Sequence, residues 1–293
     1  MRDLKDLIEP VLDELRQTPP RPRALQATTL LTSLQEALNE VSQIRISAAR
    51  EVVAEGETTA KEFAAELGLT PARLSQLLKS GLKPERALFG NGPLTVAIGA
   101  KRETRTAGTG GEKIEASAVL SEQVIAAYDM LAATAEAYGL SATREIVPMP
   151  GLDLRLNRPN CVAITSPRLL QLVGLILNES SPIVFDSDDR GWFLVDKNTD
   201  TRYRSPADEG EAADYAFIGR LPRSDGKGTF LYLAGIHSRG TLGAVHHVTH
   251  NVAELYQQTK GQAWSAVIRV EYDPDAMTTI LATALVTPIY FGN

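Results

Sequence analysis

Residues 60 to 79 constrain the fold of this chain most, because their apolar and turn-forming positions fit two short helices that cross at a steep angle. Such a crossing needs a small residue at the contact and a permissive residue in the turn. Ala64 suits the contact, and Gly68 follows where the first helix would end. Thr70 suits the N-cap of the second helix, and Pro71 suits its first turn. The small core of this pair would consist of Phe63, Leu67, Leu69, Leu74 and Leu77.

The outward face of the second helix is short, polar and cationic. With the core fixed, the residues that point outward are Ala72, Arg73, Ser75, Gln76 and Lys79, and none of them is acidic. Side chains of this kind reach base edges and phosphates in a major groove. We therefore expect double-stranded DNA as a partner. A purely structural helix pair in an all-α domain or a protein-binding module is the alternative.

Over these twenty residues the chain resembles the bacterial helix-turn-helix DNA-binding superfamily, with a local similarity to sigma-factor region 4 and to small repressors. The resemblance implies that Thr70, Arg73, Ser75, Gln76 and Lys79 face DNA. It brings no operator and no effector with it.

The residues before this pair are predicted to be helical. Residues 3 to 15 carry an apolar stripe, and the prolines of residues 18 to 23 predict an extended connector. Residues 25 to 54 continue with apolar side chains at helical spacing. The predicted domains are residues 1–24, an amphipathic helix with a proline-rich connector; residues 25–90, a helix-turn-helix domain; and residues 91–293. The stripe of residues 3 to 15 would pack on its own domain or on a second subunit.

Charge and cysteine content limit the partners and the compartment. The net charge of the chain is −6, and residues 1 to 93 hold 12 basic and 13 acidic side chains, so DNA affinity would need a concentrated patch, doubled in a homodimer. The lone Cys161 excludes an internal disulfide and a cysteine-based zinc site. Because no export signal and no apolar run of about 18 residues occurs, we expect a cytoplasmic protein without a membrane partner.

The pattern after residue 93 changes to short apolar runs interleaved with helical segments. Helical patterns cover residues 119–138, 169–177 and 242–256. Strands that alternate with helices predict a Rossmann-like α/β domain, and a hairpin turning at Asn198 to Asp200 makes a mixed sheet. The predicted strands are residues 94–100, 161–165, 183–185, 192–195, 215–218, 230–234 and 266–270.

Ligands of such domains bind beyond the carboxyl ends of the strands, so the loops there are the candidate site. The main loop follows an apolar strand and opens a helix, whose free N–H groups favour an anion. A tight strand-to-helix turn made by Gly235 and Gly240 is an equal alternative. The candidate ligand-binding residues are Gly235, His237, Ser238, Arg239, Gly240 and Thr241 from this loop, Thr165, Ser166 and Arg168 after a second strand, and Asp186 after a third.

Two features of these loops leave alternatives open. Asp186 belongs to an acidic run that fits either a cation or ribose site or a solvated turn. His246, His250 and Glu254 share one helix face, but no further ligand completes a metal site, so we expect no metal there and leave any cofactor unknown.

No nucleophile, base and orienting residue fall in one recognisable catalytic motif, which favours binding over turnover. We therefore expect a DNA-binding transcriptional regulator with a C-terminal domain that senses a small anionic ligand, such as a nucleotide. The alternative is an enzyme that acts on a nucleotide or sugar phosphate and is recruited by the helical domain.

Overall fold

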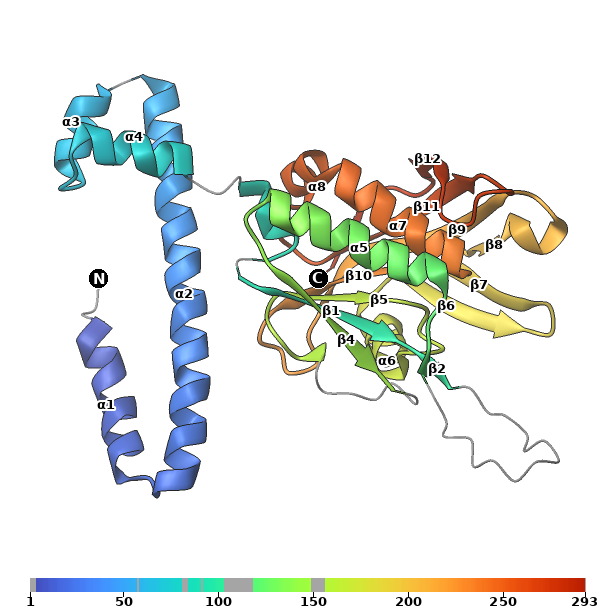
Figure 1. The fold of residues 1–293 in the computed structure, drawn as a ribbon, viewed down its shortest axis with the longest axis horizontal. Helices are drawn as coiled ribbons and strands as arrows, with labels where there is room; N and C mark the ends of the chain where they lie inside the picture. The colour runs from blue at the N-terminus through green and yellow to red at the C-terminus, as the bar shows by residue number, and fades with distance from the viewer. Residues whose placement is uncertain are drawn as a thin grey trace. The chain divides into compact units, whose positions relative to one another are not determined.

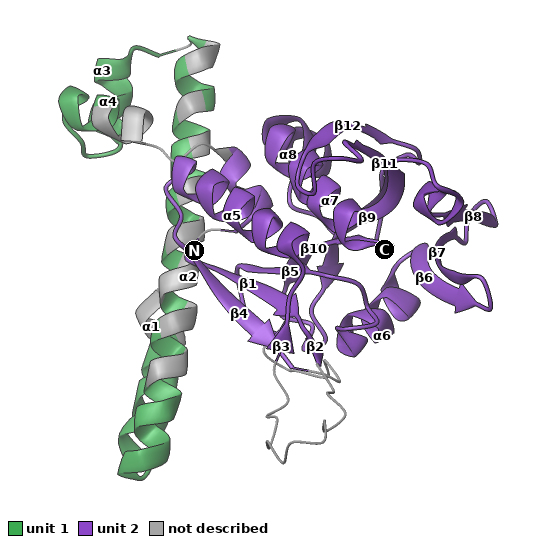
Figure 2. Cartoon of the chain, turned by 45° about the vertical axis from the view of Figure 1, so that its right-hand side comes forward, with its two compact units in different colours: residues 1–84 green, residues 85–293 purple. Residues whose placement is uncertain are grey.

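A computed structural model of the chain describes residues 4–56, 58–80, 84–90, 92–102, 118–148 and 156–292. The chain forms two compact units, residues 1–84 and residues 85–293 (Figure 2). The boundary falls before the predicted one at residue 90, because Leu88 and Phe89 are buried in the core of the second unit. The side chain of Arg220 also donates hydrogen bonds to the carbonyl oxygens of Ala87 and Leu88.

The first unit is helical and is dominated by one long helix. This helix, α2, begins at Pro20, so the extended connector predicted over residues 18 to 23 is wrong. Prolines are tolerated there because the N–H groups of the first helical turn have no partner within the helix. The helices of this unit are α1 (Leu4–Gln17), α2 (Pro20–Glu55), α3 (Ala60–Glu66) and α4 (Pro71–Ser80).

The ends of α3 and α4 follow the local chemistry of the sequence. The hydroxyl oxygen of Thr59 accepts the Glu62 N–H, and the Glu62 carboxylate accepts the Thr59 N–H in return. Gly68 makes the turn at a φ of 65°. The hydroxyl oxygen of Thr70 accepts the Arg73 N–H at 3.1 Å and so caps α4. Ala64 is fully buried at the contact between the two helices and packs with Ala49 of α2.

The second unit is an α/β unit built on a large mixed sheet, as predicted. The strand order is β12-β11-β9-β10-β5-β1-β4, and β13 pairs with β11. The strands β4, β1, β5 and β10 are parallel, whereas β9, β11 and β12 continue the sheet in antiparallel fashion. Its strands are β1 (Leu94–Gly99), β4 (Ala142–Val147), β5 (Cys161–Ile164), β9 (Ala213–Pro222), β10 (Thr229–Gly235), β11 (Trp264–Tyr272), β12 (Ile280–Leu285) and β13 (Tyr290–Phe291).

Both faces of this sheet are covered (Figure 1). One face packs against α5, α7 and α8, and the other against α6 and a small antiparallel sheet of β6, β7 and β8. The predicted hairpin is confirmed as β7 and β8. The covering elements are α5 (Glu122–Ala137), α6 (Gln171–Ser180), α7 (Ser238–His250), α8 (Val252–Thr259), β6 (Ile183–Asp188), β7 (Gly191–Asp196) and β8 (Thr201–Arg204). The described residues also form short elements: the 3₁₀ turns η1 (Pro84–Leu88) and η3 (Pro206–Glu209), and a ribbon of β2 (Lys101–Arg102) and β3 (Ala118–Val119).

No helix of the described residues is both long and apolar enough to span a membrane.

Candidate functional site

A cavity of about 250 Å³ lies at the carboxyl ends of the neighbouring parallel strands β1, β5 and β10. The first turns of α5 and α7 also border it. This is the position in which α/β sheets bind ligands, because the loops after parallel strands meet at one edge. The lining residues are Gly99, Lys101, Val119, Leu120, Ser121, Val124, Thr165, Ser166, Arg168, Leu169, Gly235, Ile236, His237, Ser238 and Thr241.

The end of β5 is held in a strained conformation beside the cavity. Thr165 has a φ of 116°, a backbone conformation that a β-branched residue rarely adopts. Its hydroxyl oxygen accepts the Gly99 N–H at 3.0 Å, and its carbonyl oxygen accepts a hydrogen bond from the buried Tyr232 hydroxyl at 2.8 Å. These partners fix Thr165 between the end of β1 and the middle of β10. Strain of this kind persists only where the surroundings enforce it, as they do in binding sites.

The loop between β10 and α7 is packed too tightly to admit side chains at its two glycines. A Cβ atom on Gly235 would lie 2.3 Å from the backbone carbon of Gly240, and one on Gly240 would lie 2.1 Å from a carboxylate oxygen of Asp214. The Thr241 hydroxyl oxygen accepts the Gly235 N–H at 3.0 Å. The tight-turn explanation of the two glycines is therefore correct in its geometry, and the turn itself borders the cavity.

Asp214 is a fully buried carboxyl group behind this loop. One of its oxygens accepts the backbone N–H of His237 at 2.8 Å, and the other accepts the N–H of Tyr215. Burial raises the pKa of Asp214 to about 6, against the opposing effect of these hydrogen bonds. The carboxyl group holds the start of α7 against the end of β10.

His237 is tied to the acidic loop between β8 and β9. Its Nε2 atom lies 2.8 Å from a carboxylate oxygen of Asp208, in η3. Both side chains are partly exposed, 47% and 43% respectively. A carboxylate in this position sets the orientation of the imidazole at the rim of the cavity.

The cavity has a cationic and hydroxyl-rich lining. Lys101 comes from β2, Arg168 from the loop after β5 and His237 from the loop after β10, and none of the described lining residues is acidic. The N-terminal turns of α5 and α7 add the positive ends of two helix dipoles. Leu120, Val124 and the other apolar residues form the remaining wall. The combination suits an anion with an apolar part.

Most of the predicted ligand-binding residues meet at this cavity. Three of them do not line it. Gly240 lies behind the loop against Asp214. The Arg239 guanidinium stacks over the Tyr272 ring at 4.5 Å and donates to the carbonyl oxygen of Pro274, away from the cavity. The residues that line it as predicted are Thr165, Ser166, Arg168, Gly235, His237, Ser238 and Thr241.

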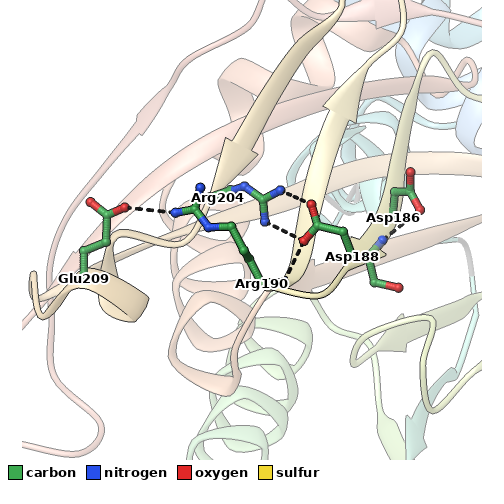
Figure 3. A network of polar contacts seen from close by, with 6 residues as sticks. Asp186, Asp188, Arg190, Arg204 and Glu209 are labelled. Atoms are coloured by element: carbon green, nitrogen blue, oxygen red, sulfur yellow. Dashed lines mark hydrogen bonds and ion pairs between the residues drawn. The ribbon is translucent and has the colours of Figure 1, made fainter.

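The third predicted ligand-binding residue that does not line the cavity is Asp186, which lies in β6 on the small sheet (Figure 3). One of its carboxylate oxygens accepts the Ser187 N–H at 2.8 Å. Its neighbour Asp188 pairs with the Arg204 guanidinium, which lowers the pKa of Asp188. The ion pair joins β6 to β8 within the small sheet, and Asp186 does not line the cavity.

Two of the three histidine rings of α7 stack on each other. The His246 and His250 rings stack with their centroids 3.9 Å apart, and the Nδ1 atom of His250 lies 2.8 Å from the His246 carbonyl oxygen. The buried His247 contacts the Thr283 hydroxyl. In the part of the chain that the structure describes, no three acidic, histidine or cysteine side chains form a metal-binding group.

The residues predicted to face DNA lie on or next to α4. Thr70, Arg73 and Ser75 are exposed, and the Thr70 hydroxyl also serves as the helix cap. Gln76 and Lys79 are in the helix, but their side chains lie outside the described part of the structure.

Several residues of the cavity were missed from the sequence. Lys101 lies two residues beyond the end of β1, so the strand-end rule applied to β1 would have found it, whereas Ser121 reaches the cavity as the N-cap of α5. The buried Gln123 accepts a hydrogen bond from Ser238 and donates one to the Met277 carbonyl oxygen. The sequence marks residues 205–214 as a long acidic loop that fits either a cover over a ligand or a floppy insertion, but only the fold shows that Asp208 and Asp214 reach His237.

Comparison with protein-family models, with curated proteins and with solved structures found no match to this chain. Its function therefore has to be argued from its own geometry.

Proposed function

We propose that the protein is a DNA-binding transcriptional regulator whose α/β unit binds a small anion, such as a nucleotide, in the cavity at the ends of β1, β5 and β10. The observation that carries the proposal is the convergence of Lys101, Arg168 and His237 on one cavity that two helix N-termini also border. A phosphate or carboxylate bound there would be stabilised by charge-assisted hydrogen bonds. The apolar wall would cover a base or another uncharged part of the ligand.

The ligand half of the proposal predicts a specific loss of affinity on removal of Arg168. Thermal shift and calorimetry with AMP, ADP and inorganic phosphate provide the probes. We expect at least one of them to stabilise the protein, and Arg168→Ser to weaken its binding about tenfold or more, because a hydrogen bond to a charged group contributes roughly 1.5–3 kcal/mol. Arg190→Ser is the matched control, because Arg190 lies on the β6–β7 hairpin and pairs with Glu209. Equal binding by both variants would exclude this cavity as the site.

The DNA half rests on the helix pair α3 and α4. Its capped ends, the turn at Gly68 and the buried Ala64 support a compact pair, and the exposed Arg73 and Ser75 support contact with a nucleic acid. Binding of the anion and of DNA would then be coupled if each favours the same conformation of the chain.

Substitution of the cationic residues of α4 tests the DNA half. In gel shifts with fragments from the genomic neighbourhood of its gene, Arg73→Ala and Lys79→Ala should each weaken binding about tenfold, and the salt dependence should fall by roughly one unit for a lost phosphate contact. Arg16→Ala is the control, because Arg16 lies on α1 and pairs with Glu9 and Asp13. Unchanged binding by both α4 variants would reject the DNA assignment.

An enzyme acting on a nucleotide or sugar phosphate is the second candidate, favoured by the contact between His237 and Asp208 at the cavity rim. A carboxylate that orients an imidazole is a common arrangement for proton transfer. Conversion of a bound nucleotide that is lost in His237→Ala would support the enzyme. Binding without conversion supports the sensor.

A further inference from the structure

Among the side chains of the first unit that the structure describes, few apolar ones are buried and several large ones are exposed. Among its described side chains, the main buried cluster consists of Ala49, Ala64 and Leu74, with Phe63 and Leu67 packed against it. A cluster of this size offsets little of the conformational entropy that a helical unit loses on folding. The large apolar side chains that remain exposed are Val11, Leu25, Leu31, Leu38, Val41 and Ile44, between 42% and 67% exposed.

Among the exposed large apolar side chains described in α2, Leu31, Leu38 and Val41 fall on a seven-residue repeat, whereas Leu25 and Ile44 lie outside it. Leu31 and Leu38 are seven apart, as are Leu34 and Val41, which gives the alternating three and four spacing of a coiled-coil seam. Leu31 is 67% exposed, Leu38 61% and Val41 62%. Small or apolar residues extend the same repeat in both directions, and Arg45 is its one charged position. The full seam is Ala24, Ala27, Leu31, Leu34, Leu38, Val41, Arg45, Ala48 and Val52.

Few charged residues lie near this seam, so another apolar helix can pack on it. From Ala24 to Ile44 the only charged residues are Glu36 and Glu40, and both fall outside the seam positions of the repeat. The helix pair α3 and α4 packs on α2 through Ala49, which is also not a seam position. The helix α1 also contacts α2, but the side chains of Leu31, Leu38 and Val41 stay 61–67% exposed.

We propose that the seam of α2 packs against the same seam of a second copy of this chain, so that the protein is a homodimer joined through α2. A repeat sustained over four heptads is complementary to another helix with the same repeat, and this chain supplies one of 36 residues. An identical partner gives a closed two-fold interface. The proposal does not depend on the proposed function, although a dimer would double the basic face of α4.

Light scattering coupled to size-exclusion chromatography of the full chain tests the proposal. We expect the wild type to have twice the chain mass of 31.7 kDa and Leu38→Glu to have the mass of one chain. The matched control is Leu175→Glu, because Leu175 is a leucine with a similar exposed fraction, 59%, on α6 of the other unit. This control variant should stay dimeric. A monomeric wild type, or a dimeric Leu38→Glu, would overturn the proposal. Circular dichroism checks that the variant keeps its helices.

Disulfide trapping in the otherwise unchanged seam keeps the test independent of folding defects in Leu38→Glu. Leu38 is the midpoint of the seam, so in Leu38→Cys the two introduced thiols meet in a parallel or an antiparallel pair and should form a covalent dimer on oxidation. The native Cys161 does not compete, because it is buried and burial raises its pKa to about 12. Leu31→Cys should crosslink to itself only in a parallel pair. Failure of Leu38→Cys to form a covalent dimer would contradict packing through α2.

Discussion

Gly235→Ala is expected to lower the stability of the α/β unit by about 3 kcal/mol, and its melting temperature by roughly 6–12 °C. The added methyl group would lie 2.3–2.4 Å from backbone atoms of Gly240 and Thr241, which cannot move aside as a side chain can. Relief requires the end of β10 and the start of α7 to separate, and this breaks the contact between the Gly235 N–H and the Thr241 hydroxyl.

Urea denaturation followed by tryptophan fluorescence measures this loss in the full chain. Both tryptophans, Trp192 and Trp264, lie in the α/β unit, so the signal reports the unfolding of that unit. Gly174→Ala is the control, because Gly174 lies within α6 and a Cβ atom there would meet only the Pro167 side chain, at 3.3 Å. Alanine is favoured over glycine in a helix, so the control should be neutral or slightly stabilised. Similar midpoints for both variants would mean that the loop yields without cost.

Asp214→Asn is expected to remove a pH dependence of stability that the wild type shows between about pH 4 and pH 6. Burial raises the pKa of Asp214 to about 6, above the ordinary value of 3.8, so the folded protein holds a proton that the unfolded chain has already released. The stabilisation is complete below the unfolded pKa and is lost as the pH rises through the folded one. Two pKa units at about 1.4 kcal/mol each amount to about 3 kcal/mol.

The measurement is the difference in unfolding free energy between wild type and Asp214→Asn across this pH range. Groups that titrate in both proteins cancel, so the difference should fall by about 3 kcal/mol from pH 4 to pH 7. Asp188→Asn gives a change of opposite sign, because the Arg204 guanidinium lowers the pKa of Asp188 and its contribution is lost as the pH falls. A pH-independent difference for Asp214→Asn would show that Asp214 carries no raised pKa.

The interior of the α/β unit could be predicted from the sequence, whereas its edges could not. The strands β1, β5 and β10 are buried on both faces and therefore read as continuous apolar runs. The edge strands β4 and β12 were missed, because most of their side chains are exposed and their pairing comes from neighbours distant in the sequence.

The cavity was predictable to the level of loops and not of side chains. Strand ends identify the loops, and so His237 and Arg168 were found. The prediction that Arg239 lies beside His237 in the cavity was wrong. Side chains two residues apart along a helix point about 200° apart, and at the start of α7 the Arg239 side chain turns toward Tyr272. Asp208 and Asp214 could not be picked out from the acidic stretch of residues 205–214, because only the fold shows which of its carboxylates is paired or buried.

The tight packing of the loop at residues 235–241 determines which parts of the cavity can change. Gly235 and Gly240 cannot acquire side chains without a clash. The Thr241 hydroxyl binds the backbone N–H of Gly235, and the buried Asp214 carboxyl group binds that of His237. A change of ligand preference during evolution therefore has to come from other lining positions, which are His237 and Ser238 of the loop and Lys101, Ser121 and Arg168 of the other walls. The backbone of this loop is the part of the cavity that substitution cannot change, and ligand selectivity depends on the side chains around it.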